Sequence, residues 1–326
     1  MSDPARELDA ALTSVAVADL SSWSRLIGDG PDLLDLLHRL TTQDVRGLTR
    51  GSGRAAVLTS AKGRIVERLS VHHLGPRGVL LISGPESAGR VLAHLKKYTF
   101  AEVTGLSDVS ADTVALSVIG PRWREAALAA GVALPEPYGA AAANLAGRTV
   151  DVIGTNGFDA EGLIILGPSS GASGIAEALT ALGTPIGAAA FEAWRVLTGR
   201  PLTGRELTEE YNPLEAGLAD AVSFTKGCYV GQEVVARLNT YDKVSRRIVR
   251  LALPAGIALP APGSPVKDGE RVLGAVPSAV AIPGREGAAA LAYVKLRELP
   301  PGRTALASAA AGGSVSASLV TEPEAS

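Results

Sequence analysis

The sequence predicts an α+β fold that ends in a small β-rich domain. Up to about residue 245, short strand-like apolar runs are joined by tight turns and alternate with segments of helical period. After residue 245 the runs are short and lie among turns rich in proline and glycine. Antiparallel hairpins mixed with helices favour an α+β architecture, and the second pattern favours a small β-barrel or sandwich.

The individual elements follow from the same periodicities. Pro31 follows a Gly-Asp-Gly turn and precedes a stripe of leucines, so it suits the first position of a helix. We expect helices at 31–40, from Pro85 through Leu95, at 173–182, at 188–197 and from about Gly231 onward. We expect strands at 55–59, 65–73, 79–83, 114–119, 150–153 and 163–166, then at 248–253, 271–276, 288–294 and 314–320.

These patterns divide the chain into four expected segments. Residues 1–20 are interpreted as a loose N-terminal arm, 21–244 as the main domain, 245–320 as the β-barrel domain and 321–326 as a disordered tail. Residues 254–265 are open to a second interpretation, as a mobile linker.

Composition excludes several classes of function. The chain has 326 residues and a net charge of −2, so it has no general attraction to nucleic acid or to anionic membranes. It has no apolar run of about 20 residues and no apolar signal core at its N-terminus, so we expect a cytoplasmic protein. Cys228 is the only cysteine, and neither it nor the four histidines form a metal-ligand pattern. We therefore expect no metal site built by this chain alone.

One motif resembles a dinucleotide-binding fingerprint but has the wrong context. Residues 51–56 read Gly-Ser-Gly-Arg-Ala-Ala. Such a fingerprint follows a strand and opens a helix, whereas this segment follows a turn and runs into a strand. We interpret it as a hairpin turn.

The segment Lys226-Gly227-Cys228-Tyr229-Val230-Gly231-Gln232-Glu233 carries the most varied chemistry in the chain. Cys228 stands beside a lysine and just before an expected helix N-terminus, and both features favour the thiolate. Gly227 and Gly231 permit sharp turns or a close approach to a ligand, and Tyr229 offers a flat ring. An ordinary loop with a buried, inert cysteine is the open alternative.

The same eight residues match the motif K-G-C-Y-x-G-Q-E, so the chain resembles the YgfZ family within the superfamily of glycine-cleavage T-protein aminomethyltransferases. Other segments resemble that superfamily in order along residues 15–300. These segments are Asp19-Leu20-Ser21, Leu40–Val45, Leu58–Ile65, Trp194–Gly199 and Asn212–Ala216. Only the Cys228 motif separates YgfZ proteins from the wider superfamily.

This resemblance implies folate-binding lobes of antiparallel sheets and helices, including a ferredoxin-like part, and a tetrahydrofolate or related reduced folate as ligand. It implies that Arg195 and an acidic residue near 156–161 approach the pterin, with Glu161 as first choice and Asp159 as second. A carboxylate and a guanidinium suit the donor and acceptor edge of a pterin. Lys226, Tyr229 and Gln232 are further folate-binding candidates, and Lys226 has an alternative role in tuning Cys228. Arg195 on a helix surface and turn roles for the two acids are the open alternatives.

Glu67 is the second candidate for chemistry, after Cys228. Period two places it with Ile65, Leu69 and Val71 on one strand face, so its carboxylate is paired, protonated or lining a pocket, or the strand lies at an edge and Glu67 is solvated. The transferases carry an Asp pair at the matching position, where this chain has Glu67-Arg68. That departure argues against ordinary aminomethyl transfer.

The resemblance therefore implies an accessory protein, not a conventional enzyme, for assembly, repair or maintenance of iron–sulfur clusters. Its partners would be iron–sulfur enzymes or cluster-assembly proteins, which Cys228 would meet beside the folate pocket. The alternatives are a folate-dependent aminomethyltransferase that uses Glu67, and an interaction module that no longer binds folate.

Overall fold

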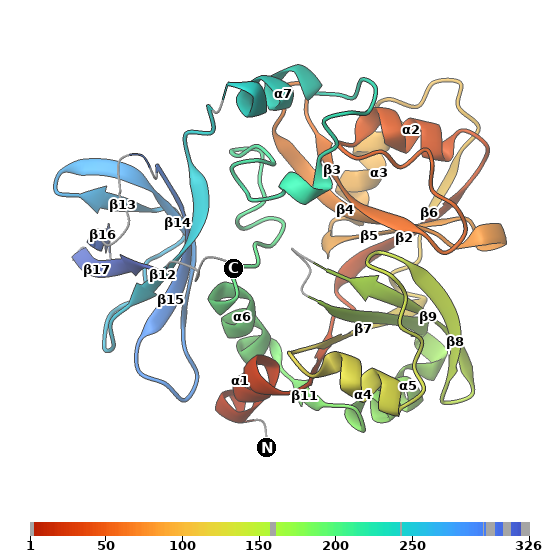
Figure 1. The fold of residues 1–326 in the computed structure, drawn as a ribbon, viewed down its shortest axis with the longest axis horizontal. Helices are drawn as coiled ribbons and strands as arrows, with labels where there is room; N and C mark the ends of the chain where they lie inside the picture. Colours follow the sequence, from red (N-terminus) through yellow and green to blue (C-terminus); the bar gives the residue numbers. More distant parts are fainter. Residues whose placement is uncertain are drawn as a thin grey trace.

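Two open sheets and one barrel organise the part of the chain that the computed structural model describes, which is residues 3–156, 161–241, 243–295, 297, 304–308 and 314–320. Figure 1 shows the barrel on the left, the two open sheets on the right, and a long connecting segment between them. The expected α+β class with a C-terminal barrel is confirmed.

The first open sheet is entirely antiparallel and has the strand order β3-β4-β5-β2-β6. Its strands are β2 (Trp23–Asp29), β3 (Gly53–Thr59), β4 (Ile65–His73), β5 (Val79–Pro85) and β6 (Gly105–Asp108). Helices α2 (Leu33–Leu40) and α3 (Ala88–Lys96) bury their leucine-rich stripes against one face of this sheet. β4 lies between β3 and β5, so it is not an edge strand.

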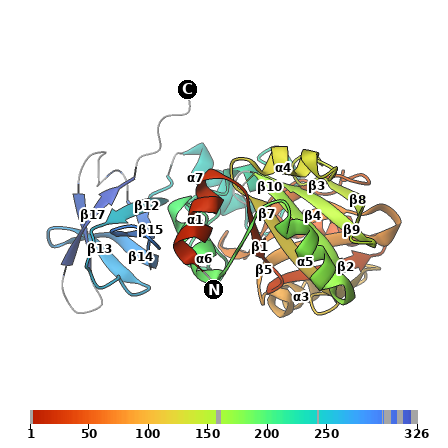
Figure 2. The same ribbon diagram turned by 90° about the horizontal axis from the view of Figure 1, so that it is seen from below.

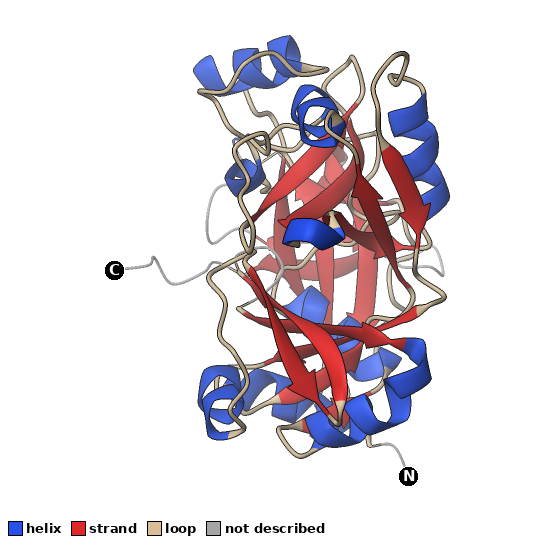
Figure 3. Cartoon of the chain, turned by 90° about the vertical axis from the view of Figure 1, so that its right-hand side faces the viewer, coloured by secondary structure: helices blue, strands red, loops and turns tan. Residues whose placement is uncertain are grey.

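The second open sheet has the order β11-β1-β7-β10-β9-β8, and only the pair β1–β11 is parallel. Its strands are β1 (Ala16–Asp19), β7 (Thr113–Ile119), β8 (Ala140–Leu145), β9 (Arg148–Thr155), β10 (Gly162–Pro168) and β11 (Thr184–Ile186). Helices α4 (Trp123–Ala129) and α5 (Ala172–Thr180) cover one face. Leu80 and Ile82 of β5 pack on Ile153, Ile164 and their neighbours, which joins the two sheets (Figure 3).

The C-terminal strands close into a barrel in the order β12-β15-β14-β13-β16-β17. They are β12 (Arg247–Leu253), β13 (Ser264–Asp268), β14 (Arg271–Ala281), β15 (Ala288–Val294), β16 (Thr304–Ser308) and β17 (Ser314–Leu319). Helix α6 (Ala188–Leu197) contacts β14 and β15 on one side and α1 (Pro4–Thr13) on the other, so these two helices lie between the barrel and the open sheets (Figure 2).

The interpretation of residues 1–20 as a loose arm is wrong. Asp3 caps α1 by accepting hydrogen bonds from the Ala5 and Arg6 amides, and Leu8 is buried against α6. Residues 16–19 form β1, which pairs with both β7 and β11. The small apolar face of α1 is buried against α6, and this burial holds the segment in place. An apolar pattern this short gives only a weak signal in the sequence. The expected tail, 321–326, lies outside the described residues.

Candidate functional site

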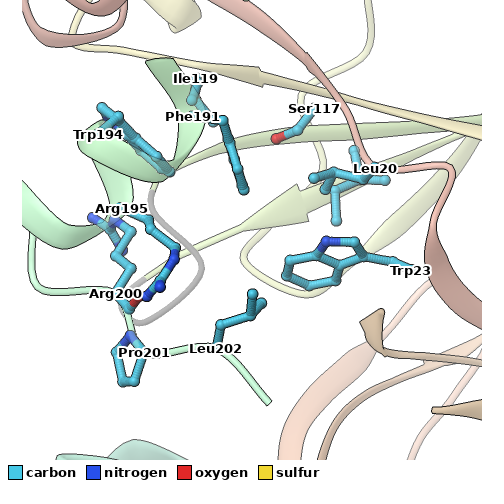
Figure 4. Close-up of a pocket in the computed structure, with 11 residues that line it drawn as sticks. Leu20, Trp23, Ser117, Ile119, Phe191, Trp194, Arg195, Arg200, Pro201 and Leu202 are labelled. Carbon is cyan, nitrogen blue, oxygen red and sulfur yellow. Dashed lines mark hydrogen bonds between the residues drawn. The ribbon is translucent and has the colours of Figure 1, made fainter. Parts of the chain in front are cut away.

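A hollow lined by aromatic and aliphatic side chains lies between α6 and the second open sheet. Its cavity volume is about 40 Å³, and the empty space counted out through its open mouth is about 500 Å³. Figure 4 shows Trp23 and Phe191 pointing into this hollow from opposite walls, with Leu20 and Leu202 beside them. Its wall comprises Leu20, Trp23, Ser117, Ile119, Ile164, Phe191, Trp194, Arg195, Arg200, Pro201 and Leu202. We call this space the aromatic hollow.

A second hollow continues from the aromatic hollow toward the surface. The two share Leu20, Trp23, Phe191 and Leu202. The outer hollow also takes in the ion pair of Glu192 with Arg205, whose Oε1 and Nη1 atoms lie 2.6 Å apart. The aromatic hollow is therefore lined mainly by apolar side chains, whereas the outer hollow also carries charged groups.

Arg195, on α6, forms part of the wall of the aromatic hollow, but the protein itself uses all of its donors. Nε and Nη2 donate to Glu192 at 2.6 Å each, and Nη2 also donates to Ser278 at 3.1 Å. Nη1 donates to Glu206 and to the Arg200 carbonyl at 3.1 and 3.2 Å. A guanidinium has five N–H groups, so Arg195 has none left for a pterin. The alternative of a surface arginine is also wrong, because only 2% of Arg195 is exposed.

The carboxylates around Arg195 hold it in its charged form. Burial opposes the charge, but hydrogen bonds and charge from Glu192 and Glu206 outweigh it and raise the pKa of Arg195. Ser278 belongs to β14 and Glu206 to the segment after α6, so this one side chain connects three parts of the fold. Glu206 is fully buried, and its Oε1 atom has no hydrogen-bond partner.

Glu67 lies in the middle of β4 and is fully buried, so a solvated edge position is excluded. Its Oε1 accepts from the Thr203 hydroxyl at 2.6 Å and from the Arg68 and Gly84 amides at 3.1 and 3.4 Å. Its Oε2 has no hydrogen-bond partner, and Arg90 Nη2 is 3.7 Å away. Burial raises the pKa of Glu67, against the opposing effects of Thr203 and Arg90. Thr203 follows Leu202, which lines both hollows.

Cys228 is exposed on a loop that runs into α7 (Gln232–Thr240), so the alternative of a buried, inert cysteine is wrong. Gly231 precedes the helix at φ +85°, and a side chain there would lie 2.4 Å from the Ser60 carbonyl oxygen. Gly231 therefore makes the expected sharp turn, and its close approach is to the protein's own backbone at Ser60. A side chain at Gly227 would meet no atom within 4 Å, so no contact within the protein requires glycine there.

Lys226 bonds to the end of α2. Its Nζ atom donates to the carbonyl oxygens of His38, Thr41 and Gln43, the last two at 2.7 and 3.0 Å. The side chain is buried, and burial lowers the pKa of Lys226 to about 8. An ammonium has three N–H groups, so none remains for the glutamate tail of a folate or for the Cys228 thiol.

Tyr229 is buried beside the same lysine. Lys226 Nζ lies 5.1 Å from the centre of the Tyr229 ring, and burial raises the pKa of this tyrosine to about 12. Gln232 is half-buried at the first turn of α7. Lys226, Cys228, Tyr229 and Gln232 do not contribute to the walls of the two hollows. In Figure 1, α7 lies at the top of the molecule and α6 near the lower centre.

The two predicted acids fall between β9 and β10 in the sequence. Glu161 is exposed, and Asp159 lies outside the described residues. The structure therefore does not bring the described acid of this pair to Arg195, and Glu192 and Glu206 are its carboxylate partners.

The main residues that sequence reasoning missed are Trp23, Phe191, Glu192 and Glu206. Glu192 had a usable signal, since it is three residues before Arg195 on the same helix face. Glu206 approaches Arg195 only through the fold of the segment after α6.

Within the described part of the chain, no group of three or more His, Cys, Asp or Glu side chains is placed to hold a metal ion. Over the same residues, every helix is too short or too polar to span a membrane.

The architecture defines a class of protein with two α+β lobes, each built on an open sheet, and a C-terminal barrel around a central segment. The glycine cleavage system aminomethyltransferase T from Bartonella henselae has the same fold, with a TM-score of 0.79 over 98% of this chain and 89% of that chain, at 21% identity. Residues 2–226 match the family model described as the GCVT N-terminal domain. The chain belongs to this family.

Two curated relatives extend the similarity beyond the matched domain. A chloroplastic protein of Arabidopsis thaliana, named provisionally as a transferase, is 32% identical over 303 residues, which cover 91% of this chain and 69% of the relative. An aminomethyltransferase of Symbiobacterium thermophilum is 28% identical over 293 residues, which cover 85% of this chain and 77% of the relative.

Proposed function

We propose that this chain is a cytoplasmic, tetrahydrofolate-binding accessory protein of the YgfZ type that serves iron–sulfur enzymes or the proteins that assemble their clusters. The folate would occupy the aromatic hollow, and the exposed Cys228 would meet the partner protein. The family and its aminomethyltransferase members support a folate ligand, and the complete Cys228 motif supports the YgfZ type.

The observation that carries the proposal is the facing pair of Trp23 and Phe191 in the aromatic hollow (Figure 4). A pterin is a flat ring, and aromatic side chains on opposite walls bind such rings by stacking and by excluding water. Ser117 contributes a hydroxyl group to the wall. Arg195 shapes this wall through Glu192 and Glu206, so its role is to position the site, not to contact the ligand.

The exposed thiol supports the second half of the proposal. Cys228 stands on the surface at the start of α7, where a protein partner can reach it. Because its loop contributes nothing to the walls of the two hollows, the folate site and the partner site are separate regions in this proposal. From the sequence we expected Cys228 to lie beside the folate pocket. In this proposal the thiol and the folate lie in separate regions.

Calorimetry and tryptophan fluorescence with tetrahydrofolate test the ligand. We expect saturable binding to the wild type and a loss of roughly tenfold or more in affinity for Trp23→Leu. Trp123→Phe is the matched control, since Trp123 packs in the separate core beneath α4. No heat and no fluorescence change in the wild type would exclude folate.

Complementation of a deletion strain tests the thiol. Cys228→Ala should fail to restore the activity of iron–sulfur enzymes while the purified variant still binds tetrahydrofolate. Full restoration by Cys228→Ala would exclude a role for the sulfur.

The second candidate function is a folate-dependent aminomethyltransferase, and the environment of Glu67 favours it. A fully buried carboxyl group with a raised pKa and an unbonded Oε2 atom is suited to holding a proton. In that case the protein would transfer the one-carbon unit of an aminomethyl donor to tetrahydrofolate, forming methylenetetrahydrofolate and releasing ammonia, and Glu67→Gln would abolish the reaction while leaving folate binding intact. An inactive wild type that binds folate would leave the accessory function.

A further inference from the structure

The loop that carries Cys228 is bonded to its surroundings at both ends. On its N-terminal side, the Ser223 amide donates to the Thr42 carbonyl at 2.8 Å, and the Thr42 hydroxyl donates to the Ala221 carbonyl. On its C-terminal side, the Val230 amide donates to the Arg39 carbonyl at 3.2 Å. The loop therefore spans the C-terminal end of α2.

Between these ends, Lys226 supplies the contact that holds the middle of the loop. The last carbonyls of a helix have no partner within the helix, and a cation there also interacts favourably with the helix dipole. The Lys226 ammonium satisfies the His38 carbonyl in the last turn of α2 and two carbonyls just beyond the helix. Next to it, Gly227 and Cys228 are exposed.

Charged side chains near Lys226 do not take the place of its three carbonyl partners. His38 Nδ1 lies 3.1 Å from Asp44 Oδ1, Asp44 favours the charge on Lys226, and Arg46 opposes it. Lys226 is thus a buried cation whose Nζ atom donates to neutral carbonyl oxygens of α2 and of the residues that follow it.

We propose that Lys226 is a positioning residue that caps the C-terminal end of α2 and thereby holds the Cys228 loop in one exposed conformation. It acts on Cys228 through the backbone and contacts neither the folate nor the thiol. This inference rests on the proposed function only in taking Cys228 as the residue that meets the partner.

The test compares Lys226→Met, Lys226→Arg and the wild type by amide hydrogen exchange of the peptide that covers residues 224–231. Lys226→Met keeps the length of the side chain but removes its donors, and we expect roughly tenfold faster exchange. Lys226→Arg keeps the charge and the donors and should restore most of the protection. Lys62→Met is the matched control, because Lys62 is an exposed lysine on the neighbouring 60–63 turn, and it should leave exchange unchanged.

A second measurement separates positioning from electrostatic tuning of the sulfur. Because Cys228 is the only cysteine in the chain, the pH profile of its alkylation by iodoacetamide reports one thiol. We expect the midpoint of this profile to be the same in Lys226→Met and in the wild type. A rise of about one pH unit in the midpoint would show that Lys226 stabilises the thiolate and would overturn the proposal.

Unchanged exchange in Lys226→Met would also overturn the proposal. If that variant does not fold, Lys226→Gln, which retains two N–H donors, replaces it and should show intermediate exchange. Both readouts are independent of folate and of any partner. Failure of tetrahydrofolate binding or of the Cys228→Ala complementation would therefore contradict the proposed function without deciding the role of Lys226.

Discussion

Arg195 and Lys226 are both buried cations whose donors are all used by the protein, but they are compensated in different ways. Arg195 bonds to two carboxylates, and its pKa is raised. Lys226 bonds to three carbonyl oxygens, and burial lowers its pKa to about 8. A buried charge beside opposite charges fixes the wall of the aromatic hollow, whereas a buried charge beside neutral dipoles anchors a surface loop more weakly.

Removal of the Arg195 cation is expected to cause the largest loss of stability. Arg195→Met would leave the fully buried Glu206 carboxylate with the Leu202 amide, 2.9 Å away, as its remaining bond. We expect urea unfolding to show a loss of about 3–5 kcal/mol in the free energy of unfolding. Arg122→Met, which removes an exposed ion pair with Glu125, should lose at most about 0.5 kcal/mol. An equally small loss for Arg195→Met would contradict the ionic description of the hollow.

The pH dependence of Lys226 distinguishes the two cations further. Its pKa is about 8 in the folded protein and ordinarily 10.5, so the folded state releases this proton first as pH rises. The unfolded state then holds more protons, and the stability of the wild type relative to Lys226→Met should increase between about pH 8 and 10.5. We expect a gain of about 2–3 kcal/mol in urea unfolding curves measured across this range. If the stability difference between the wild type and Lys226→Met stays constant or falls over this range, the three carbonyl groups stabilise the protonated Lys226 as well as water does.

Glu67 is an intermediate case, a buried carboxyl group with one cation at 3.7 Å. The pKa of Glu67 is raised above its ordinary value of 4.5, so the folded state keeps this proton to a higher pH than the unfolded state does. The stability that protonated Glu67 contributes is therefore lost as the pH rises above that ordinary pKa. Glu67→Gln should therefore be more stable than the wild type by about 1 kcal/mol at pH 7 and equal to it near pH 4. Lower stability of Glu67→Gln at pH 7 would mean that Arg90 fully compensates an ionised Glu67.

Sequence reasoning succeeded where one residue pattern decides the outcome. The strand-like, period-two pattern of residues 65–73 and the helical period of 188–197 predicted β4 and α6 at their observed ends. It failed for β1 and β11, because both strands are short and Ala16 pairs with Thr184 from a distant part of the sequence, a pairing that local patterns do not contain.

The candidate site shows the same division. The period-two pattern indicated that Glu67 faces apolar neighbours, and the structure buries it completely. The partners of Lys226 are backbone carbonyls, which every residue carries, so no side-chain pattern marks them. Ser278 reaches Arg195 from the barrel across 83 residues of chain, a contact that local periodicity does not contain.

The smallest effect on stability is expected at Cys228, and it sharpens the contrast between the loop and its anchor. The thiol is exposed, so Cys228→Ser should change the free energy of unfolding by less than about 0.5 kcal/mol. It should also leave hydrogen exchange over residues 224–231 unchanged, because Lys226 and the ends of the loop hold this segment. A loss of complementation in Cys228→Ser would then reflect the chemistry of the sulfur. A loss of several kcal/mol would instead mean that the sulfur packs against its neighbours, and the loop would depend on its cysteine as well as on its lysine.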